Sequence, residues 1–448
     1  MSGKQSRHRE FSVFQIIKYS IPASLSSLVG PLASVVDTSL IGHLGSHELA
    51  ALSLCVSVIE SFGWLLIFLV HGPTGNISFY LGQKKYEMVG KTIKVSLFSA
   101  LSTGILASIF LFFTINQIWD LYGADSQLRS LATDYMNIRL LALPLSILLT
   151  SITGILRGLD LIVRSLVLSS ITTILNFIIS FILIYHFKMG LAGAGLGTLI
   201  SLIIGVVLGF GQFFIGERAR LFKLHSLNFF EVKIWKNFSK DSISLLGRSA
   251  FLVSSFFIAT IVATRLGHIQ LATHQIVLQL WLFSSYFIDG IAITGNIQVA
   301  LFLGEGNQQK SIHYIKKTLV MSLGIGLFFM LRYFLFKDLL VGIFTTDRDI
   351  AILFSNIFLP VCLFQFPNAL AFVTDGIVFG LRKFHLLALH MGVGFVMLFL
   401  PFTYLGYSSS SLTLVWVAMG MLNLFRAVSG LWIIRNYFIV SGSGTRKI

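Results

Sequence analysis

Asp37 is an isolated carboxylate within a long apolar segment, in the stretch "PLASVVDTSLIGHLG" at residues 31–45. A carboxylate near the middle of a bilayer costs roughly 2.5–3.5 kcal/mol on insertion scales, so it usually faces a cavity or a partner. Ser27, Gly30, Ser34 and Asp37 recur every three or four residues and so share one helical face. The pattern predicts a polar stripe that lines water and carries a proton-binding group. The alternative is an Asp37 that is merely solvated at the outer membrane edge.

The helix that carries Asp37 also contains Pro22 and Pro31. Each proline removes a backbone hydrogen bond from the helix, so a bend is predicted. A carboxylate in a bent helix can change its position with its protonation state.

The composition indicates what surrounds this helix. Of 448 residues, 55% are hydrophobic and only 11% are charged, and the mean hydropathy is +0.85. Soluble domains are about 25% charged, so an integral membrane protein is predicted. The net charge of +15 is spread over short gaps between apolar runs, which argues against a nucleic-acid partner. Cys55 and Cys362 lie in apolar runs and offer neither a disulfide framework nor a metal site.

Apolar runs predict twelve transmembrane helices. The N-terminal tail leads directly into the first, which we expect to be retained rather than cleaved as a signal peptide. About 23 of the 33 Lys and Arg residues fall on the side of the two chain ends, against about 7 opposite, so both termini are expected in the cytoplasm. The predicted helices lie near residues 14–41, 48–72, 92–116, 131–155, 163–186, 191–215, 241–264, 271–300, 314–336, 350–379, 385–406 and 411–438.

An internal repeat divides the chain. At an offset of 222 residues, "HLGSHELA" at 43–50 aligns with "RLGHIQLA" at 265–272, and "GILRGL" at 154–159 aligns with "GIVFGL" at 376–381. We therefore predict a six-helix lobe at 1–215, a basic cytoplasmic linker at 216–240 and a second six-helix lobe at 241–448. An even number of helices per lobe makes the repeat parallel, with a pseudo-two-fold axis along the membrane normal.

Several motifs in fixed order resemble the multidrug and toxic compound extrusion (MATE) family over nearly the full chain. They are "SVVDTSLIGHLGSHELAALSL", "YMNIRLLALP", "GILRG", "ILNFIIS", "GLAGAGLGT", "RLGHIQLATHQIVLQLW" and "DGIAITGN". The pairs Asp289-Gly290 and Asp375-Gly376 are similar to those of its DinF-like branch. The resemblance implies a secondary active antiporter that exports organic cations or other amphipathic compounds in exchange for protons or sodium ions.

The resemblance also implies a polar network around Asp37 in the N-terminal lobe, formed by Tyr135, Asn176 and Thr198. The family more often has a second aspartate where this chain has Ser180. Because sodium favours clustered oxygen ligands and a proton needs one titrating group, proton coupling is favoured over sodium.

In the C-terminal lobe, Asn368 stands where the NorM-like branch has an aspartate implicated in sodium binding, and Leu252 where that branch has a glutamate. The further candidates for a cavity in this lobe are Asp289, Asp375, Gln279 and Arg248. Two alternatives remain: each Asp-Gly pair caps a break in its helix, and Arg248 snorkels at the cytoplasmic edge instead of pairing with a carboxylate. Glu60 is either in the cavity or locally solvated.

The expected function is therefore proton-coupled export of an amphipathic or cationic small molecule by alternating access. We expect a monomer in the plasma (inner) membrane, without metal or cofactor. A flippase of a lipid-linked intermediate in the same superfamily is the alternative, although such proteins tend to have fourteen helices. A membrane enzyme is disfavoured because the histidines are scattered without ligand spacing.

Overall fold

The computed structural model describes residues 12–42, 44–122, 126–215, 220–224, 231–345 and 347–442, and in these residues the regular structure is helical. The first half contains α1 Val13–Gly42, α2 Ser46–Leu65, α3 Phe68–Gly82, α4 Tyr86–Tyr122, α5 Ser126–Gly158, α6 Ile162–Phe181, the π-helical turn η1 Ile182–His186 and α7 Gly190–Phe214. The second half contains α9 Val232–Leu266, α10 His268–Gly304, α11 Gln308–Leu335, α12 Lys337–Phe344, α13 Arg348–Leu363, α14 Gln365–Gly380, α15 Phe384–Gly394, η2 Phe395–Phe399, α16 Leu400–Ser408 and α17 Leu412–Gly442.

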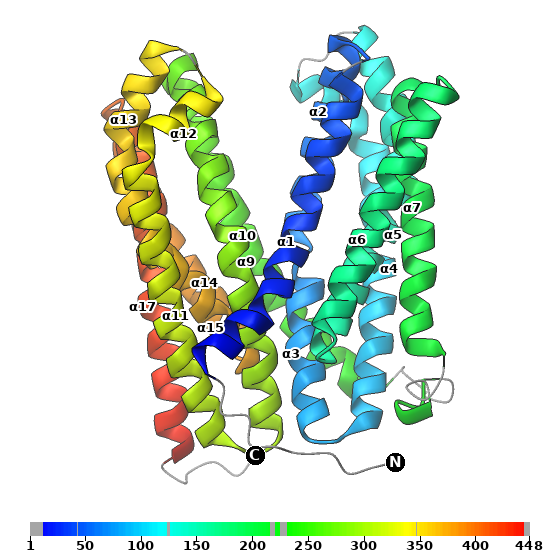
Figure 1. Ribbon diagram of the computed structural model, residues 1–448, viewed down its shortest axis with the longest axis vertical. Coiled ribbons are helices and arrows are strands. Elements are labelled where there is room, and N and C mark those ends of the chain that lie inside the picture. Colours follow the sequence, from blue (N-terminus) through cyan, green and yellow to red (C-terminus); the bar gives the residue numbers. More distant parts are fainter. Residues whose placement is uncertain are drawn as a thin grey trace.

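Eleven helical segments of the described chain are long and apolar enough to cross a membrane, or up to twelve if the bent pair α13 and α14 is one span. This agrees with the predicted all-helical membrane fold. The helices form two groups that diverge from one end of the molecule (Figure 1). We call α1–α7 the N-lobe and α9–α17 the C-lobe. Figure 1 also shows that α1 begins and α17 ends at that same end.

The helix boundaries differ from the sequence prediction at three places. The second span continues to Gly82 as α3, ten residues beyond the predicted end. The predicted helix 350–379 is broken after Leu363 and bent by 45°. Within the predicted linker 216–240, residues 216–219 and 225–230 lie outside the described residues, and α9 begins at Val232. Its first turns are amphipathic, and Trp235 packs edge-on against Phe98 with ring centroids 5.5 Å apart.

The internal repeat is visible in the backbone. Left-handed conformations occur in pairs 222 residues apart: Asp160 (φ 62°) with Arg382 (φ 58°), and Lys188 (φ 55°) with Ser410 (φ 52°). Such positive φ angles are uncommon for residues other than glycine, so their recurrence reflects equivalent turns rather than chance. The two halves therefore share one chain path.

The lobes touch closely at the end where α1 begins. A Cβ atom on Gly82 of α3 would lie 2.2 Å from the carbonyl oxygen of Leu301 on α10, and one on Gly304 would lie 2.1 Å from the carbonyl oxygen of Phe79. Only glycine allows these backbones to approach so closely. Nearby, Arg382 donates to Asn76 Oδ1 at 2.5 Å, and its guanidinium lies 4.6 Å from the ring centroid of Phe79.

Helix α1 belongs to the N-lobe in sequence but contacts both lobes, packing against α6 and α10. It runs obliquely between them and changes direction along its length (Figure 1). Pro22 and Pro31 both lie inside it. The helix that carries Asp37 is therefore placed to respond to movement of either lobe.

Candidate functional site

The N-lobe contains a cavity of about 380 Å³ between α1, α2, α5, α6 and α7. Four charged side chains line it: Asp37, Glu60, Arg139 and Arg157. The predicted stripe of Ser27, Gly30, Ser34 and Asp37 also lies along its wall. Asp37 thus lies in the wall of this cavity.

Asp37, Asn176 and Thr198 form a chain of polar contacts across α1, α6 and α7. In one orientation of the Asn176 amide, Nδ2 donates to Asp37 Oδ1 at 3.1 Å and Oδ1 accepts from Thr198 Oγ1 at 3.0 Å. In the opposite orientation, Nδ2 donates to Thr198 Oγ1 at 3.0 Å and the amide oxygen faces Asp37. The first arrangement satisfies both ends of the amide and suits an ionised carboxylate, which only accepts hydrogen bonds.

Two arginines accompany the acids of this cavity. Arg139 of α5 interacts electrostatically with both Asp37 and Glu60, and Glu60 also interacts with the hydroxyl of Ser34. Arg157, in the last turn of α5, donates from Nη2 to Ser26 Oγ on α1 at 2.9 Å. With all four side chains ionised, the cavity wall carries no net charge.

Two residues of the predicted network lie behind the cavity wall. Tyr135 is buried, is not part of the lining, and lies beneath Arg139, whose guanidinium is 5.8 Å from the ring centroid. Ser180 is fully buried against Gly197, and its hydroxyl has no hydrogen-bond partner among the described residues. Neither side chain is part of the cavity lining in this conformation.

Asp289 of α10 joins α1 to the C-lobe. Its Oδ2 accepts a hydrogen bond from Ser27 Oγ at 2.9 Å, and it interacts electrostatically with Arg157 and Arg248. Adjacent serines of α1 therefore bind opposite charges, Ser26 an arginine of the N-lobe and Ser27 an aspartate of the C-lobe.

Asp375 of α14 is buried in an ion-pair cluster. It accepts hydrogen bonds from Arg248 of α9 and from Arg426 of α17, the latter at 2.6 Å. Arg248 is only 8% exposed, so it pairs within the bundle and does not snorkel.

The two Asp-Gly pairs do not cap helix breaks, because α10 and α14 continue unbroken through them. Their glycines allow close helix packing. A Cβ on Gly290 would lie 2.4 Å from the backbone nitrogen of Ser24, and one on Gly376 would lie 2.2 Å from the carbonyl oxygen of Ala292.

The remaining C-lobe candidates are spread over different environments. Asn368 is buried and donates to Ser285 Oγ at 3.2 Å. Leu252 packs against the C-lobe apolar core. Gln279 is exposed on α10 and lines neither described cavity, because it lies on the face of that helix opposite its packed residues. No cluster of His, Cys, Asp or Glu that could hold a metal ion occurs in the described part of the chain.

The sequence prediction assigned no role to Arg139, Arg157 or Arg426. Arg139 and Arg157 lie within the motifs "YMNIRLLALP" and "GILRG" that were read only as family signatures. An arginine inside a membrane span faces the protein interior or water by default, and that rule would have identified Arg139 and Arg426, whereas Arg157 lies just beyond the predicted span 131–155.

Comparison with known proteins gives one family. The MatE family model matches twice, at residues 22–182 and 245–405. "Protein DETOXIFICATION 44, chloroplastic" from Arabidopsis thaliana is 27% identical and the alignment covers 93% of this chain and 81% of that protein. "DNA damage-inducible protein F" from Escherichia coli (strain K12) is 23% identical, with 92% and 89% covered.

A solved structure described as "Crystal structure of MATE in the bent conformation" superposes with a TM-score of 0.88 at 21% identity, covering 97% of this chain and 98% of that one. At this identity the likeness concerns the fold alone. The double match of the family model covers both lobes.

Proposed function

Because this chain belongs to the MATE family of multi-pass membrane transporters, we propose that it is a proton-coupled antiporter that exports cationic or amphipathic compounds. The family consists of transporters rather than enzymes, and its members need no cofactor. The DinF-like branch is supported by the Asp-Gly pairs and by the match to the E. coli protein. The observation that carries the proposal is Asp37 in the wall of a 380 Å³ cavity, where its carboxylate accepts from the Asn176 amide at 3.1 Å.

Binding of a proton to Asp37 and binding of a cationic substrate oppose each other through the net charge of the cavity. With Asp37 ionised, its charge and that of Glu60 balance Arg139 and Arg157, and a cation is accepted. Protonation of Asp37 leaves a net positive charge. At a separation of about 6 Å and an effective dielectric constant of about 20, this charge disfavours a bound cation by about 3 kcal/mol, roughly a hundredfold in affinity.

Alternating access would couple this competition to transport. We propose that Asp37 takes up a proton when the cavity faces outward and releases it when the cavity faces the cytoplasm. Protonation neutralises Asp37, which weakens the hydrogen bond that its carboxylate accepts from the Asn176 amide between α1 and α6 and permits further bending at Pro22 and Pro31. One charge crossing 100 mV supplies about 2.3 kcal/mol before any pH gradient is added.

The orientation of the transporter in the membrane follows from the distribution of Lys and Arg along the chain. The Lys and Arg bias favours both termini in the cytoplasm of a plasma (inner) membrane. On that orientation, the closely packed Gly82 and Gly304 end is cytoplasmic. The conformation described here would then be closed toward the cytoplasm.

The test is Asp37→Asn in inverted membrane vesicles. Uptake of a fluorescent cation driven by a proton gradient is expected to fall to the level of empty vesicles, with membrane insertion unchanged. Asp120→Asn is the matched control, because Asp120 is an exposed carboxylate paired with Arg129 at the surface. Proton-driven uptake by Asp37→Asn at the wild-type rate would refute the proposal, and uptake driven by sodium alone would replace the proton as coupling ion.

A further inference from the structure

Two of the polar contacts between the lobes, among the described residues, lie within about two helical turns of the close approach of α3 to α10. In the first, Arg382 donates from Nε to Asn76 Oδ1 at 2.5 Å. In the second, Gln298 donates from Nε2 to Asp160 Oδ1 at 3.4 Å. Asn76 lies on α3 and Gln298 on α10, whereas Asp160 and Arg382 lie in the turns that follow α5 and α14.

The internal repeat relates these two contacts to each other. Gln298 lies 222 positions after Asn76, and Arg382 lies 222 positions after Asp160. In each contact, a turn residue of one lobe therefore meets an amide side chain of the opposite lobe. Equivalent residues that meet in both directions are the mark of a two-fold interface. The two contacts thus belong to one pseudo-symmetric junction between the lobes.

Differences in charge make the first contact the stronger one. The guanidinium of Arg382 also lies 4.6 Å and 5.4 Å from the ring centroids of Phe79 and Tyr80 on α3. On its other side, Asn76 donates from Nδ2 to Asp241 Oδ2 on α9 at 3.2 Å. Asp241 in turn interacts electrostatically with Arg382. Hydrogen bonds to charged groups are stronger than those between neutral groups, so Asn76 is held twice.

The second contact lacks these reinforcements. The distance of 3.4 Å between Gln298 Nε2 and Asp160 Oδ1 is longer than the usual range for N–H···O bonds. Asp160 is exposed, so water can hydrate its carboxylate when the contact breaks. The residue equivalent to Asp241 is Tyr19, and the residue equivalent to Phe79 is Leu301. The acid and the aromatic ring of the first contact are therefore not repeated in the second.

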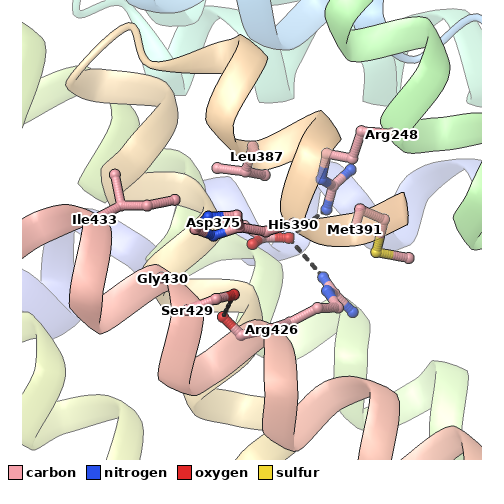
Figure 2. A pocket seen from close by; sticks show the side chains of 9 residues that line it. All are labelled: Arg248, Asp375, Leu387, His390, Met391, Arg426, Ser429, Gly430 and Ile433. Carbon is pink, nitrogen blue, oxygen red and sulfur yellow. Dashed lines mark hydrogen bonds and ion pairs between the residues drawn. The ribbon is translucent and has the colours of Figure 1, made fainter. Parts of the chain in front are cut away.

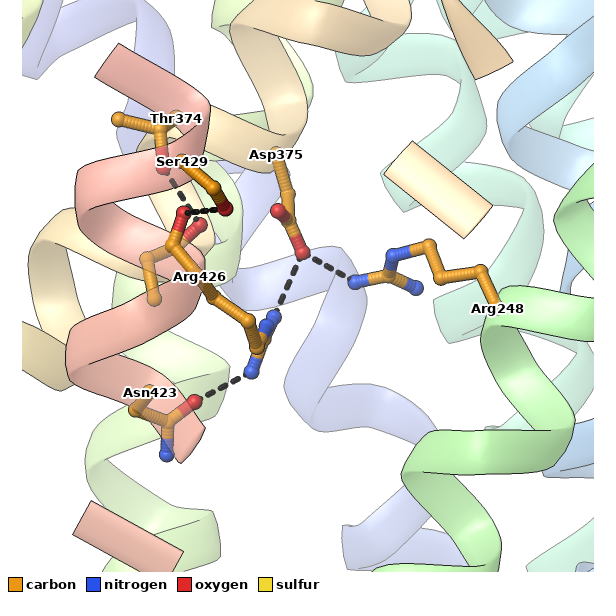
Figure 3. Close-up of polar contacts among 7 residues, drawn as sticks. Arg248, Thr374, Asp375, Asn423, Arg426 and Ser429 are labelled. Atoms are coloured by element: carbon orange, nitrogen blue, oxygen red, sulfur yellow. Dashed lines mark hydrogen bonds and ion pairs between the residues drawn. The ribbon is translucent and has the colours of Figure 1, made fainter. Parts of the chain in front are cut away.

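The buried ion pairs of the C-lobe do not cross between the lobes. Figure 3 shows the guanidinium groups of Arg248 and Arg426 converging on the Asp375 carboxylate, and we call these three residues the C-lobe cluster. The space beside them, drawn in Figure 2, is lined by residues of α9, α14, α15 and α17. All four helices belong to the C-lobe, so a movement of one lobe against the other leaves the cluster intact.

We propose that Asn76, Asp241 and Arg382 form a latch that holds the cytoplasmic end of the transporter closed. The contact between Asp160 and Gln298 is its weaker counterpart. The latch rests on the alternating access and the orientation of the proposed function, because a state open to the cytoplasm requires the lobes to separate at this end. Asp241 and Arg382 both belong to the C-lobe and only Asn76 to the N-lobe. Opening therefore leaves the two charges of the latch beside each other, where they balance.

Spin labels on the two lobes measure the closure of this end. Lys85→Cys, in the turn between α3 and α4, and Gln308→Cys, at the start of α11, place one label on each lobe at exposed positions. The native Cys55 and Cys362 are buried. Pulsed electron paramagnetic resonance of the full-length transporter in lipid nanodiscs is expected to show a main population at the shorter distance.

Asn76→Ala removes the N-lobe side of the latch and leaves Asp241 and Arg382 together. The ratio of the long-distance to the short-distance population is expected to rise roughly tenfold, the effect of losing a hydrogen bond to a charged group. Gln298→Ala, at the equivalent position of the weaker contact, should raise the ratio about twofold, the effect of losing a weak hydrogen bond.

Two further variants of Arg382 break the latch from the C-lobe side, which keeps the test decisive if Asn76→Ala does not fold. Arg382→Gln is expected to raise the ratio as much as Asn76→Ala does. Arg382→Lys keeps the charge and should raise it less. Arg164→Gln is the matched control, because Arg164 donates to the amide of Gln212 at 3.1 Å within the N-lobe, and its distances should equal those of the wild type.

Unchanged distances in both Asn76→Ala and Arg382→Gln, or an equal shift in the Arg164→Gln control, would overturn the latch. The distances are measured without substrate and without an ion gradient. A failure of proton coupling, seen as wild-type uptake by Asp37→Asn, is thereby separated from a failure of the latch, which is seen only in the distances between the lobes.

Discussion

The N-lobe cavity and the C-lobe cluster each contain two arginines, but the distances between these arginines and their acidic partners differ. In the N-lobe, Arg139 and Arg157 share a space of about 380 Å³ with two acids. In the C-lobe, Arg248 and Arg426 close directly on one aspartate beside a space of about 10 Å³. Charges around the larger space have room to exchange partners, whereas charges in direct contact cannot do so without large cost.

The repeat makes this difference informative. Asp37 has Ala259 at the equivalent C-lobe position, and Asp375 has Thr153 at the equivalent N-lobe position. Ala259 is fully buried, while Thr153 lines the N-lobe cavity. The duplicated chain path therefore carries two unlike charge arrangements.

The largest expected effect comes from removing the C-lobe carboxylate altogether. Asp375→Ala leaves Arg248 and Arg426 buried without their shared partner, and we expect a loss of about 3–5 kcal/mol of stability. Thermal unfolding in detergent measures it, with Asp37→Asn for comparison. Asp37→Asn should change stability by less than about 1 kcal/mol, because its side chain borders a cavity and keeps its shape. Equal destabilisation by the two variants would remove the distinction between the lobes.

A smaller effect is expected from Arg139→Gln. This change leaves the N-lobe cavity with one net negative charge when both acids are ionised, so a cationic substrate should bind more tightly. By the same estimate as for protonation of Asp37, we expect a gain of about 3 kcal/mol, or roughly a hundredfold in Kd. Fluorescence titration with a cationic dye measures this change. A weaker affinity would show that Arg139 holds the substrate rather than balancing the acids.

The smallest effect is expected from Ser180→Ala. The Ser180 hydroxyl is buried without a partner, so its removal should be neutral or stabilise by up to about 1 kcal/mol. Transport should match the wild type. A transport rate reduced tenfold or more would show that Ser180 belongs to the proton-binding network. Its hydroxyl could reach that network only if α6 moved against α7.

One feature of the site could be predicted because it depends on a single helix, and another because family motifs imply it. The polar stripe of Ser27, Gly30, Ser34 and Asp37 follows from helical periodicity, and it does line the cavity. The pairing of Asn176 with Thr198 was implied by family motifs and occurs at 3.0 Å. Gln279 is exposed on α10, and its place in a C-lobe cavity stays a prediction, since motif membership alone does not say which face of the helix is packed.

The amino-acid sequence by itself determined the membrane class, the helical fold, the repeat and the position of an acid on a polar helix face. These depend on composition, on runs of about 20 apolar residues and on spacing within single helices. Only the tertiary structure decided which charges meet. Arg248, Asp375 and Arg426 come from three helices separated by up to 178 positions along the chain, and no local pattern encodes their contact. Whether a buried charge borders a cavity or a direct partner depends on how several helices pack together, and that choice separates the N-lobe cavity from the C-lobe cluster.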